Sequence, residues 1–188
     1  IRSGAMTTQA DIIDNASLAS WAPILKEASL QIADPQVRYM GTVGGNVANG
    51  DPGNDMPGLM QCLDATFILR GPNGEREVKA RDFYHAAYMT EREDDEVMVA
   101  VTFDAPKGGY AYEKQKRKIG DYATAAAAVI ISKDDSTCKE ASIAMTNLSD
   151  TPVFCSAASD CLIGTSVSAE DIKNAVSSMI DAIDPAED

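Results

Sequence analysis

The sequence predicts a mixed fold of helices and antiparallel strands, and three observations support this prediction. Apolar residues recur at helical spacing near both ends of the chain, strand-like alternation fills the middle, and a long glycine-rich segment precedes the first strands. The chain has 188 residues, 45% of them hydrophobic and 24% charged, which is enough to bury a core. Its 16 basic and 29 acidic residues leave a net charge of −13. Because such a surface repels phosphate backbones and anionic lipid, we expect no nucleic-acid partner and no binding to a membrane surface.

Two helices are predicted before the glycine-rich segment. Thr8–Asn15 forms the first, with Thr8 as its N-cap and Asp11 in the capping-box position three residues later. Ser20–Ile32 forms the second, because its apolar residues recur at helical spacing, and Pro23 lies in its first turn, where a missing N–H does no harm. It ends before Pro35, since the residue that precedes a proline avoids helical dihedrals.

The segment 41–58 is different in kind. It reads GTVGGNVANGDPGNDMPG and holds six of the 13 glycines, so we expect it to be neither helix nor strand. Irregular stretches of this length inside a compact domain are usually functional or disordered, and the flanking apolar segments indicate an ordered one. A helix is predicted to open at its end, with Asp55 as N-cap, and to run through about Leu63.

Strands follow in two groups, separated by the connector Asp104–Gly109. The first group is predicted at Ala65–Arg70, Arg76–Ala80 and Val97–Phe103. The second group is predicted at Tyr110–Lys118, Ala123–Ser132 and Cys138–Asn147. Ala123–Ser132 is ambiguous, because its alanines favour helix and its β-branched residues favour strand. The hairpin turn that follows it, Lys133-Asp134-Asp135-Ser136, favours strand.

Two helices are predicted to close the chain. The first runs from Thr151 to about Gly164, and the second is capped by Ser168 with Asp171 in the capping-box position. The apolar stripe of the second helix consists of Ile172, Ala175, Val176, Met179, Ile180 and Ile183.

The sequence shows no catalytic or metal-binding constellation. His85 is the only histidine, the four cysteines form no CxxC pair, and the acidic pair Asp94-Asp95 is typical of solvated surface. We therefore expect no catalytic residue and no metal ligand, and cysteines that are free thiols of a cytosolic protein. The longest apolar run, Ala125–Ile131, falls far short of the roughly 20 residues that span a bilayer. No basic segment followed by an apolar one opens the chain, so nothing predicts export.

The motif Thr42-Val43-Gly44-Gly45-Asn46 has the clearest functional meaning. Paired glycines permit positive φ and a close approach of the backbone to a ligand, and successive N–H groups in such a turn form a nest for phosphate oxygens. Thr42 and Asn46 can add side-chain hydrogen bonds, and the helix that opens near Asp55 can direct its N-terminus at the same ligand. The motif is neither GxGxxG nor Walker A, and a tight structural turn is the alternative.

A basic run within this acidic chain forms the second motif. Four of the 16 basic residues fall between positions 114 and 118. On a strand, one face would carry Tyr110, Tyr112, Lys114, Lys116 and Lys118. Two interpretations stay open: a solvated edge strand or localisation signal, and a positive patch for a cofactor phosphate or an acidic partner.

Two segments closely resemble the FAD-binding medium subunit of molybdenum hydroxylases: IADPQVRYMGTVGGNVANGDPGNDMP and YAYEKQKRKIGDYATAAAAVI. This is the family of xanthine dehydrogenase and aerobic carbon monoxide dehydrogenase. The likeness is greatest to the carbon monoxide dehydrogenase branch, through GAMTTQ, GDPGNDMP and RKIGDYATAAAA. It extends over essentially the whole chain.

The resemblance implies an α+β fold in two domains. Residues 1–106 would form a subdomain of the vanillyl-alcohol-oxidase/MurB-like type that binds FAD, and residues 107–188 an incomplete flavoprotein C-terminal domain of antiparallel strands and helices. The second glycine-rich segment of the family, of AGGHS type, has no counterpart here. The resemblance therefore implies a chain truncated at both ends, and we expect it to bind FAD weakly or not at all by itself.

The family's cofactor-binding positions can be carried over residue by residue. Thr42, Val43, Gly44, Gly45 and Asn46 would line the diphosphate and ribityl part of FAD. The resemblance also implies cofactor contacts for Asp55 and Lys114, a flanking apolar role for Ile32 and Met98, and a ring of Tyr122 that lies over the flavin. An aromatic ring can shield one face of a flavin, and a nearby lysine favours the anionic charge of reduced flavin.

The implied function is electron transfer within an oxidoreductase. The resemblance implies a large subunit with the molybdenum cofactor, a small subunit with iron–sulfur clusters, and a quinone or another oxidant as final acceptor. It implies a cytoplasmic location, with the complex as a route to membrane association. Two alternatives stay open: a flavin-free module that docks partner subunits, and the flavoprotein subunit of a purine- or aromatic-oxidising relative.

Overall fold

The structure, a computed structural model, describes residues 1–185. Its helices are α1 (Gln9–Asp14), α2 (Ala16–Trp21), α3 (Pro23–Gln31), α4 (Pro35–Met40), α5 (Val43–Ala48), α6 (Asp55–Cys62), α7 (Ser156–Leu162) and α8 (Ala169–Asp181), with a 3₁₀ turn at Ala80–Asp82. Its strands are β1 (Arg2–Gly4), β2 (Thr66–Gly71), β3 (Gly74–Lys79), β4 (Tyr84–Ala86), β5 (Met89–Thr90), β6 (Val97–Thr102), β7 (Gly109–Gln115), β8 (Ala125–Asp134), β9 (Thr137–Thr146) and β10 (Val153–Phe154).

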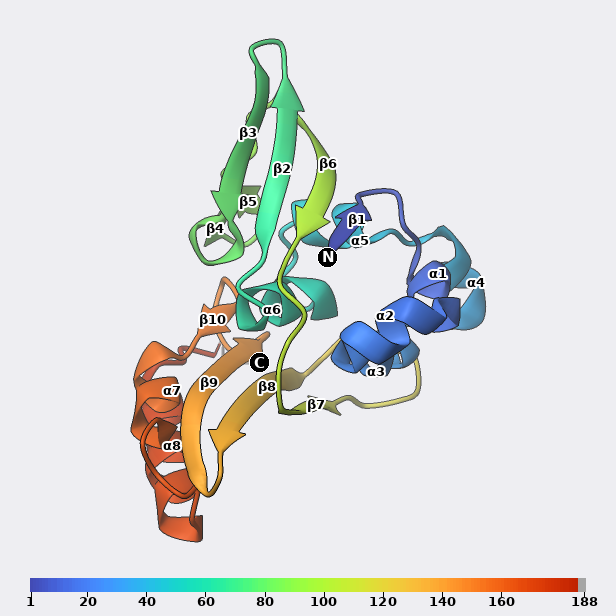
Figure 1. Cartoon of the computed structure of the whole chain (residues 1–188). Coiled ribbons are helices and arrows are strands. Elements are labelled where there is room, and N and C mark those ends of the chain that lie inside the picture. The colour runs from blue at the N-terminus through green and yellow to red at the C-terminus, as the bar shows by residue number, and fades with distance from the viewer. Residues whose placement is uncertain (186–188) are drawn as a thin grey trace.

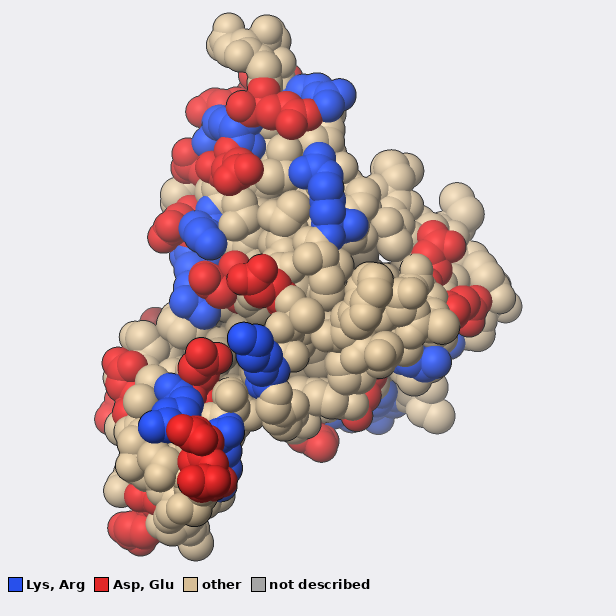
Figure 2. Space-filling model, in the orientation of Figure 1, with Lys and Arg blue, Asp and Glu red and all other residues tan. Residues whose placement is uncertain are grey.

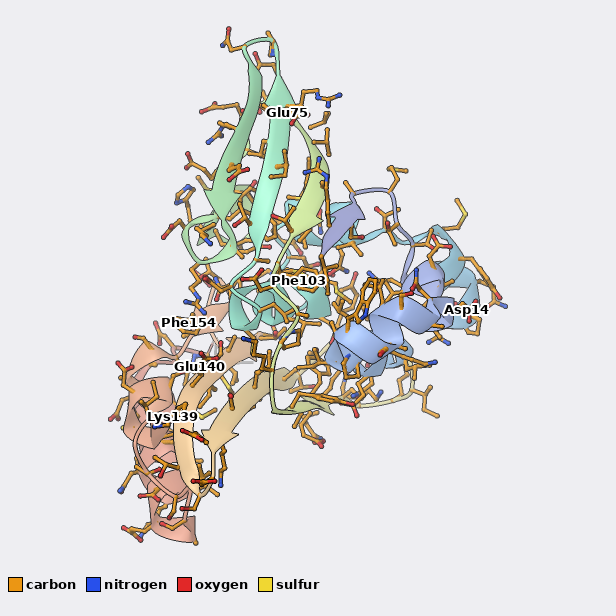
Figure 3. The ribbon with its side chains drawn as sticks, viewed as in Figure 1. Asp14, Glu75, Phe103, Lys139, Glu140 and Phe154 are labelled. Atoms are coloured by element: carbon orange, nitrogen blue, oxygen red, sulfur yellow. The ribbon has the colours of Figure 1, made fainter. Side chains whose placement is uncertain are left out.

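Two antiparallel four-stranded sheets are joined through one central helix. The strand order is β1-β6-β2-β3 in the first sheet and β10-β9-β8-β7 in the second. Helix α6 lies between them, and all eight of its residues are buried (Figure 1). Phe103, directly after β6, lies beside α6 where the chain passes from one sheet to the other (Figure 3). Helices α1 to α4 cluster on one side of this centre, and α7 and α8 pack on the β9 side of the second sheet.

Several sequence predictions are confirmed. Thr8 and Ser168 both form complete capping boxes, with Asp11 and Asp171 respectively. The ambiguous alanine-rich segment is the strand β8, and it pairs along its length with β9. The registers of β2 with β3 and of β7 with β8 confirm the antiparallel arrangement.

The predicted helix Ser20–Ile32 starts too early, whereas the prediction that Pro23 lies in the first turn of a helix is confirmed. The chain breaks between α2 and α3 at Ala22, whose φ of −147° and ψ of 67° are not helical. Pro23, which has no N–H to continue a helix, begins α3 instead. Pro35 likewise begins α4 after Asp34, whose side chain accepts from the N–H of Val37. A proline thus begins two short helices, and the sequence prediction placed Pro23 in a first turn but took Pro35 only as a stop.

The prediction that segment 41–58 is irregular throughout is also wrong. Residues 43–48 form α5, and neither Gly44 nor Gly45 has a positive φ. Gly44 is needed for space, because a Cβ there would lie 2.5 Å from the Cβ of Ala5. Gly44 therefore permits close packing onto the turn after β1, and the two glycines do not form the positive-φ nest that the sequence suggested.

Three further boundaries differ from prediction. Asn54, not Asp55, is the N-cap of α6, so Asp55 is the first helical residue. Strand β7 ends at Gln115, so the face predicted to carry Lys116 and Lys118 does not extend to them. The segment predicted as one helix from Thr151 contains β10 before α7, because residues 153–154 pair with β9.

The surface carries both signs of charge, side by side. Figure 2 shows acidic and basic side chains interspersed over the β2–β3 hairpin and, at the lower left, around the β8–β9 hairpin and α7–α8. On α8 only Ala175 of the predicted apolar stripe is buried, whereas Ile172, Val176 and Ile180 are largely exposed. None of the helices described for residues 1–185 is long and apolar enough to cross a membrane. The four cysteines are free thiols, as predicted.

Candidate functional site

An open cavity of about 300 Å³ brings several of the predicted site residues together. It is lined by Gln9, Ile32, Val37, Met40, Gly41, Thr42, Gly45 and Asn46. These residues come from α1, the end of α3, α4 and the start of α5. Pro23 and Pro35 begin α3 and α4, and the N-cap Asp34 fixes the turn between these two helices. None of the described residues that line this cavity carries a charge.

The backbone N–H groups at the start of α5 all have acceptors within the chain. Val43 donates to the carbonyl oxygen of Thr7 at 2.9 Å, and Gly44 donates to that of Ala5 at 2.8 Å. The Gly45 N–H donates to Thr42 Oγ1 at 3.0 Å. The Asn46 N–H donates to the Thr42 carbonyl oxygen at 3.0 Å. Of the amides that the sequence assigned to a phosphate nest, those of Val43 and Gly44 therefore fix α5 onto the turn after β1, and those of Gly45 and Asn46 bond to Thr42 at the start of α5.

Asn46 joins the cavity to the beginning of α6. Its Oδ1 accepts from the N–H of Met56 at 3.1 Å, and its carbonyl oxygen accepts from Asn54 Nδ2 at 3.0 Å. The N-terminus of α6 is thus occupied by Asn46, so it does not project free toward a ligand as the sequence suggested. The arrangement fixes the orientation of the Asn46 side chain at the cavity wall.

A buried ion pair joins the first residue of α6, Asp55, to Lys114 on β7. The Lys114 Nζ is 2.9 Å from Asp55 Oδ2, and the two side chains are only 1% and 5% exposed. The Tyr112 hydroxyl donates to the other oxygen of Asp55, and Lys114 also donates to the carbonyl oxygen of Gln31. Burial, reinforced by the negative charge of Asp55, raises the pKa of Tyr112 well above its ordinary value, so the phenol keeps its proton.

Tyr122 is placed quite differently, on the exposed loop between β7 and β8. Its ring is part of a side chain that is 63% exposed, and it packs against Gly53, where an added Cβ would lie 3.2 Å from the ring. The loop reaches the α3–α4 turn through Gly120, which has a φ of +81° and approaches Ala33. Tyr122 therefore stands over the glycine-rich segment with one side open to solvent.

The remaining predicted site residues do not line the cavity. Val43 is buried and faces a small core space that Ile12 and Phe103 also line. Gly44 packs on Ala5. Met98, on β6, packs partly buried against the main hydrophobic core.

Sequence reasoning missed two polar residues that the structure places at the site. Gln9 is 1% exposed and lines the cavity, and its Oε1 accepts from the Ser29 hydroxyl at 3.0 Å. Its Nε2 has no hydrogen-bond acceptor among the described residues. A signal was present in the sequence: Gln9 shares a helical face with Ile12, and Ser29 lies four residues after Leu25. Polar residues on the apolar, core-facing sides of two helices indicate a buried polar contact between them.

A second cavity, of about 590 Å³, contains none of the predicted site residues. It lies between the two sheets and is lined in part by Cys62, Arg81 and Ser142. Burial raises the pKa of the Cys62 thiol to about 12, which makes it a poor nucleophile. Arg81 is occupied, because its guanidinium lies over the ring of Phe154 at 3.5 Å and pairs with Asp64. Within residues 1–185, no cluster of three or more His, Cys, Asp or Glu side chains is arranged to hold a metal ion.

Comparison with known proteins defines the class to which this fold and site belong. Residues 1–106 match the family model described as the FAD binding domain in molybdopterin dehydrogenase. Residues 110–188 match the model described as the CO dehydrogenase flavoprotein C-terminal domain. The chain belongs to the FAD-binding flavoprotein family of the molybdopterin dehydrogenases, and both the resemblance and the α+β fold class are confirmed.

Individual relatives narrow this class. The carbon monoxide dehydrogenase medium chain of Afipia carboxidovorans is 54% identical over 92% of this chain, which covers 61% of that relative. The medium chain of the same name from Hydrogenophaga pseudoflava is 43% identical over 98% of this chain, which covers 65% of it. The solved CO dehydrogenase from Oligotropha carboxidovorans superposes with a TM-score of 0.98 at 51% identity, and this chain covers 66% of it. The chain thus spans somewhat less than two thirds of the length of these relatives.

Proposed function

We propose that this chain is the FAD-binding part of the electron-transfer subunit of a molybdenum hydroxylase, in a complex of the carbon monoxide dehydrogenase type. The observation that carries the proposal is the 54% identity to a carbon monoxide dehydrogenase medium chain across both matched domains. The medium chain would pass electrons from iron–sulfur clusters to an external oxidant such as a quinone. Oxidation of the substrate would take place on another subunit, and this chain would contribute no catalytic acid or base.

Three features of the structure support a cofactor at the predicted position. A buried amide atom of Gln9 lacks a partner at a cavity wall, a Cβ at Gly45 would lie 2.9 Å from Thr42 Oγ1, and Tyr122 presents an open ring face beside Gly53. A bound group could approach the backbone at Gly45, where no side chain intervenes, and could cover the open face of the Tyr122 ring. When bound, FAD supplies a centre that exchanges electrons singly or in pairs.

The residues of this chain would hold that cofactor in distinct ways. Thr42, Gly45, Asn46 and Ile32 would contact it at the cavity. Val43 and Gly44 would fix the helix that presents Gly45, and Met98 would contribute apolar packing from β6. Asp55 and Lys114 would act as positioning residues, because they are buried and paired with each other behind Asn46. Tyr122 would cover one face of the ring and exclude solvent from it.

The proposal extends to domains, partners and location. Residues 1–106 would form the FAD-binding unit and residues 107–188 a second domain. The partners would be a large subunit with the molybdenum cofactor and a small iron–sulfur subunit, and the complex would lie in the cytoplasm, where four free thiols persist.

The test is to isolate the protein in its natural assembly and record its visible absorption before and after reduction by the substrate of the complex. We expect the spectrum of a bound flavin, bleached by carbon monoxide under anaerobic conditions. Gly45→Val should remove the flavin spectrum and leave the assembly intact, because the branched side chain would meet Thr42 and fill the cavity. A colourless wild-type assembly would instead support the flavin-free docking module. Bleaching by a purine or an aromatic substrate alone would assign the complex to another branch of the family.

A further inference from the structure

The two-residue turn of the β4–β5 hairpin holds an exposed tyrosine in an unfavourable backbone conformation. The turn joins Ala86 to Met89, and its second residue, Tyr88, has a φ of +61°. Glycine and asparagine adopt this left-handed conformation readily, whereas a bulky side chain does so at a cost in free energy. Burial does not offset that cost, because Tyr88 is 63% exposed. Strain that packing does not explain is typical of functional positions, so the ring of Tyr88 requires another reason.

Tyr88 is joined closely to the loop between α5 and α6. Its N–H donates to the carbonyl oxygen of Gly50 at 2.8 Å. Gly50 has a φ of +64°, and a Cβ there would lie 2.9 Å from Cγ2 of Thr90 and 3.3 Å from Cα of Tyr88. The hairpin therefore fits against the loop only because Gly50 has no side chain. This contact fixes the backbone of Tyr88 on the glycine-rich segment.

Asp51 places Tyr88 and Tyr122 near one carboxylate. Its Oδ1 accepts from the N–H of Gly53 at 2.9 Å, which fixes the carboxylate in the loop. A Cβ at Gly53 would lie 3.2 Å from the Tyr122 ring and 3.5 Å from this oxygen, so the ring and the carboxylate flank the same residue. The negative charge of Asp51 raises the pKa of Tyr88, and Tyr122 adds to the rise, so the Tyr88 hydroxyl keeps its proton. Two phenol rings from separate hairpins are thus gathered at Asp51.

The exposed groups gathered here suit a flat, uncharged aromatic molecule. Tyr88 and Tyr122 are each 63% exposed, and Met89, beside Tyr88, is 61% exposed. Aromatic rings and thioethers contact planar rings favourably. The charge that acts most strongly on Tyr88 is the carboxylate of Asp51, in a chain of net charge −13, which disfavours an anionic ligand. Three side chains also offer far less than the roughly 1,000 Å² that a stable protein interface buries, which favours a small molecule.

We propose that Tyr88, positioned by Asp51 beside Tyr122, is the ring on which an uncharged quinone stacks when it approaches the cofactor from solvent. The inference rests on the proposed function, because it takes the quinone to be the external oxidant. The quinone would accept two electrons and two protons from the reduced flavin and leave as the hydroquinone. Tyr88 would bind and orient the quinone and exchange neither electrons nor protons with it.

The experiment uses the natural assembly and the variant Tyr88→Asn. Asparagine tolerates positive φ, so this substitution removes the ring without adding backbone strain, and we expect an unchanged or raised melting temperature. Binding of ubiquinone-1 to the oxidised assembly, measured by saturation-transfer NMR, should weaken about three- to tenfold. The ubiquinone-1 concentration that gives half the maximal rate of reoxidation of the substrate-reduced flavin, measured by anaerobic stopped flow, should rise by the same factor. Tyr88→Phe keeps the ring and should stay within about twofold of the wild type in both measurements.

Ferricyanide and a second tyrosine provide the controls. Ferricyanide is an octahedral anion that has no flat ring to stack, so it should reoxidise Tyr88→Asn and the wild type at the same rate. Tyr110, on β7 and 38% exposed, lines a different groove together with Val129 and Ile131. Tyr110→Asn should therefore keep the wild-type affinity for ubiquinone-1.

The outcomes separate this inference from the proposed function. Equal affinity of Tyr88→Asn and the wild type for ubiquinone-1 would overturn the role of Tyr88 and leave the flavin function standing. An equal loss with ferricyanide, or an equal loss in Tyr110→Asn, would overturn it as well, because the effect would then not depend on stacking at Tyr88. A wild-type assembly without a flavin spectrum would instead contradict the proposed function, and with it the docking of an oxidant here.

Discussion

Two polar regions lie on either side of Asn46, and they differ in how completely their groups are partnered. In the Asp55–Tyr112–Lys114 cluster each charged or hydroxyl group meets another group of the chain within the protein. At the cavity wall Gln9 keeps an atom without a partner, although it is as deeply buried. The contrast shows that the polar groups of the cluster are satisfied within the chain, whereas one side-chain atom of Gln9 has no partner among residues 1–185.

The largest expected effect comes from a break in the buried ion pair. Lys114→Met leaves the Asp55 carboxylate buried with only the Tyr112 hydroxyl, and removal of one partner of such a pair typically costs about 3–5 kcal/mol. We expect the free energy of unfolding, measured by urea titration, to fall by that amount. The double variant Asp55→Leu with Lys114→Met should recover much of the loss, since neither charge is then buried alone. A Lys114→Met chain of wild-type stability would show that the buried pair contributes no net stability to the fold.

The next largest effect separates the two adjacent glycines. Gly44→Ala places a Cβ 2.5 Å from that of Ala5, and overpacking of this kind typically costs about 1–3 kcal/mol. Gly45→Ala meets only the hydroxyl oxygen of Thr42, at 2.9 Å, so its cost should be that of a weakened N-cap, about 1 kcal/mol. Thermal unfolding of the two variants should therefore rank Gly44→Ala well below Gly45→Ala. The flavin content of the natural assembly should rank the two variants in the opposite order once each is corrected for its folded fraction, and equal losses of flavin would contradict this division.

The same two glycines show what the sequence could and could not predict. Their density with Asn and Asp indicated a functional segment, and this location agrees with the cavity that Gly45 and Asn46 line. The conformation could not be predicted, because Gly44 is required by Ala5, which lies some forty residues earlier in the chain. A long-range steric demand has no local sequence signature, whereas capping boxes at Thr8 and Ser168 depend on neighbours three residues away and were correctly predicted.

The environment of the Lys114 charge also could not be predicted from the local sequence. Its place in a basic run suggested either a solvated face or a positive patch, yet its side chain is 1% exposed and Asp55 neutralises it. The pairing joins two residues 59 positions apart, one on β7 and the other at the start of α6. Alternation predicted that Tyr112 and Lys114 share a face of the strand, but only the packing of the second sheet against α6 shows that this face is internal.

A smaller effect is expected for an ion pair on the surface of the first sheet. Arg76 donates to both oxygens of Glu96, at 2.7 and 2.8 Å, and these hydrogen bonds lower the pKa of Glu96 from 4.5 to about 2. Because the folded-state pKa is depressed, the stabilisation is present above the unfolded value and is lost as the pH falls from about 4.5 to about 2. Glu96→Gln should lower the melting temperature by a few degrees at most near neutral pH and remove this part of the acid dependence.

Salt provides the control for that surface pair. A solvent-screened pair weakens as ionic strength rises, whereas the buried Asp55–Lys114 pair should be little affected. The difference in melting temperature between wild type and Glu96→Gln should therefore shrink in molar salt, and the loss caused by Lys114→Met should persist. A Glu96→Gln variant that follows the wild-type melting curve at every pH would show that Arg76 and Glu96 contribute no net stability.

The smallest effect on stability is expected at Tyr122, which is largely exposed and is proposed to contact the cofactor and not to stabilise the fold. With 63% of the residue exposed, Tyr122→Ala should change the free energy of unfolding of the chain by no more than about 0.5 kcal/mol. If its open ring face covers a bound flavin, the same substitution in the natural assembly should speed the reoxidation of the reduced protein by oxygen, measured by stopped flow, because solvent and oxygen would reach the uncovered ring. Tyr122→Phe keeps the aromatic face and should reoxidise at nearly the wild-type rate. Unchanged reoxidation in Tyr122→Ala together with a large loss of stability would instead assign this ring to packing against Gly53.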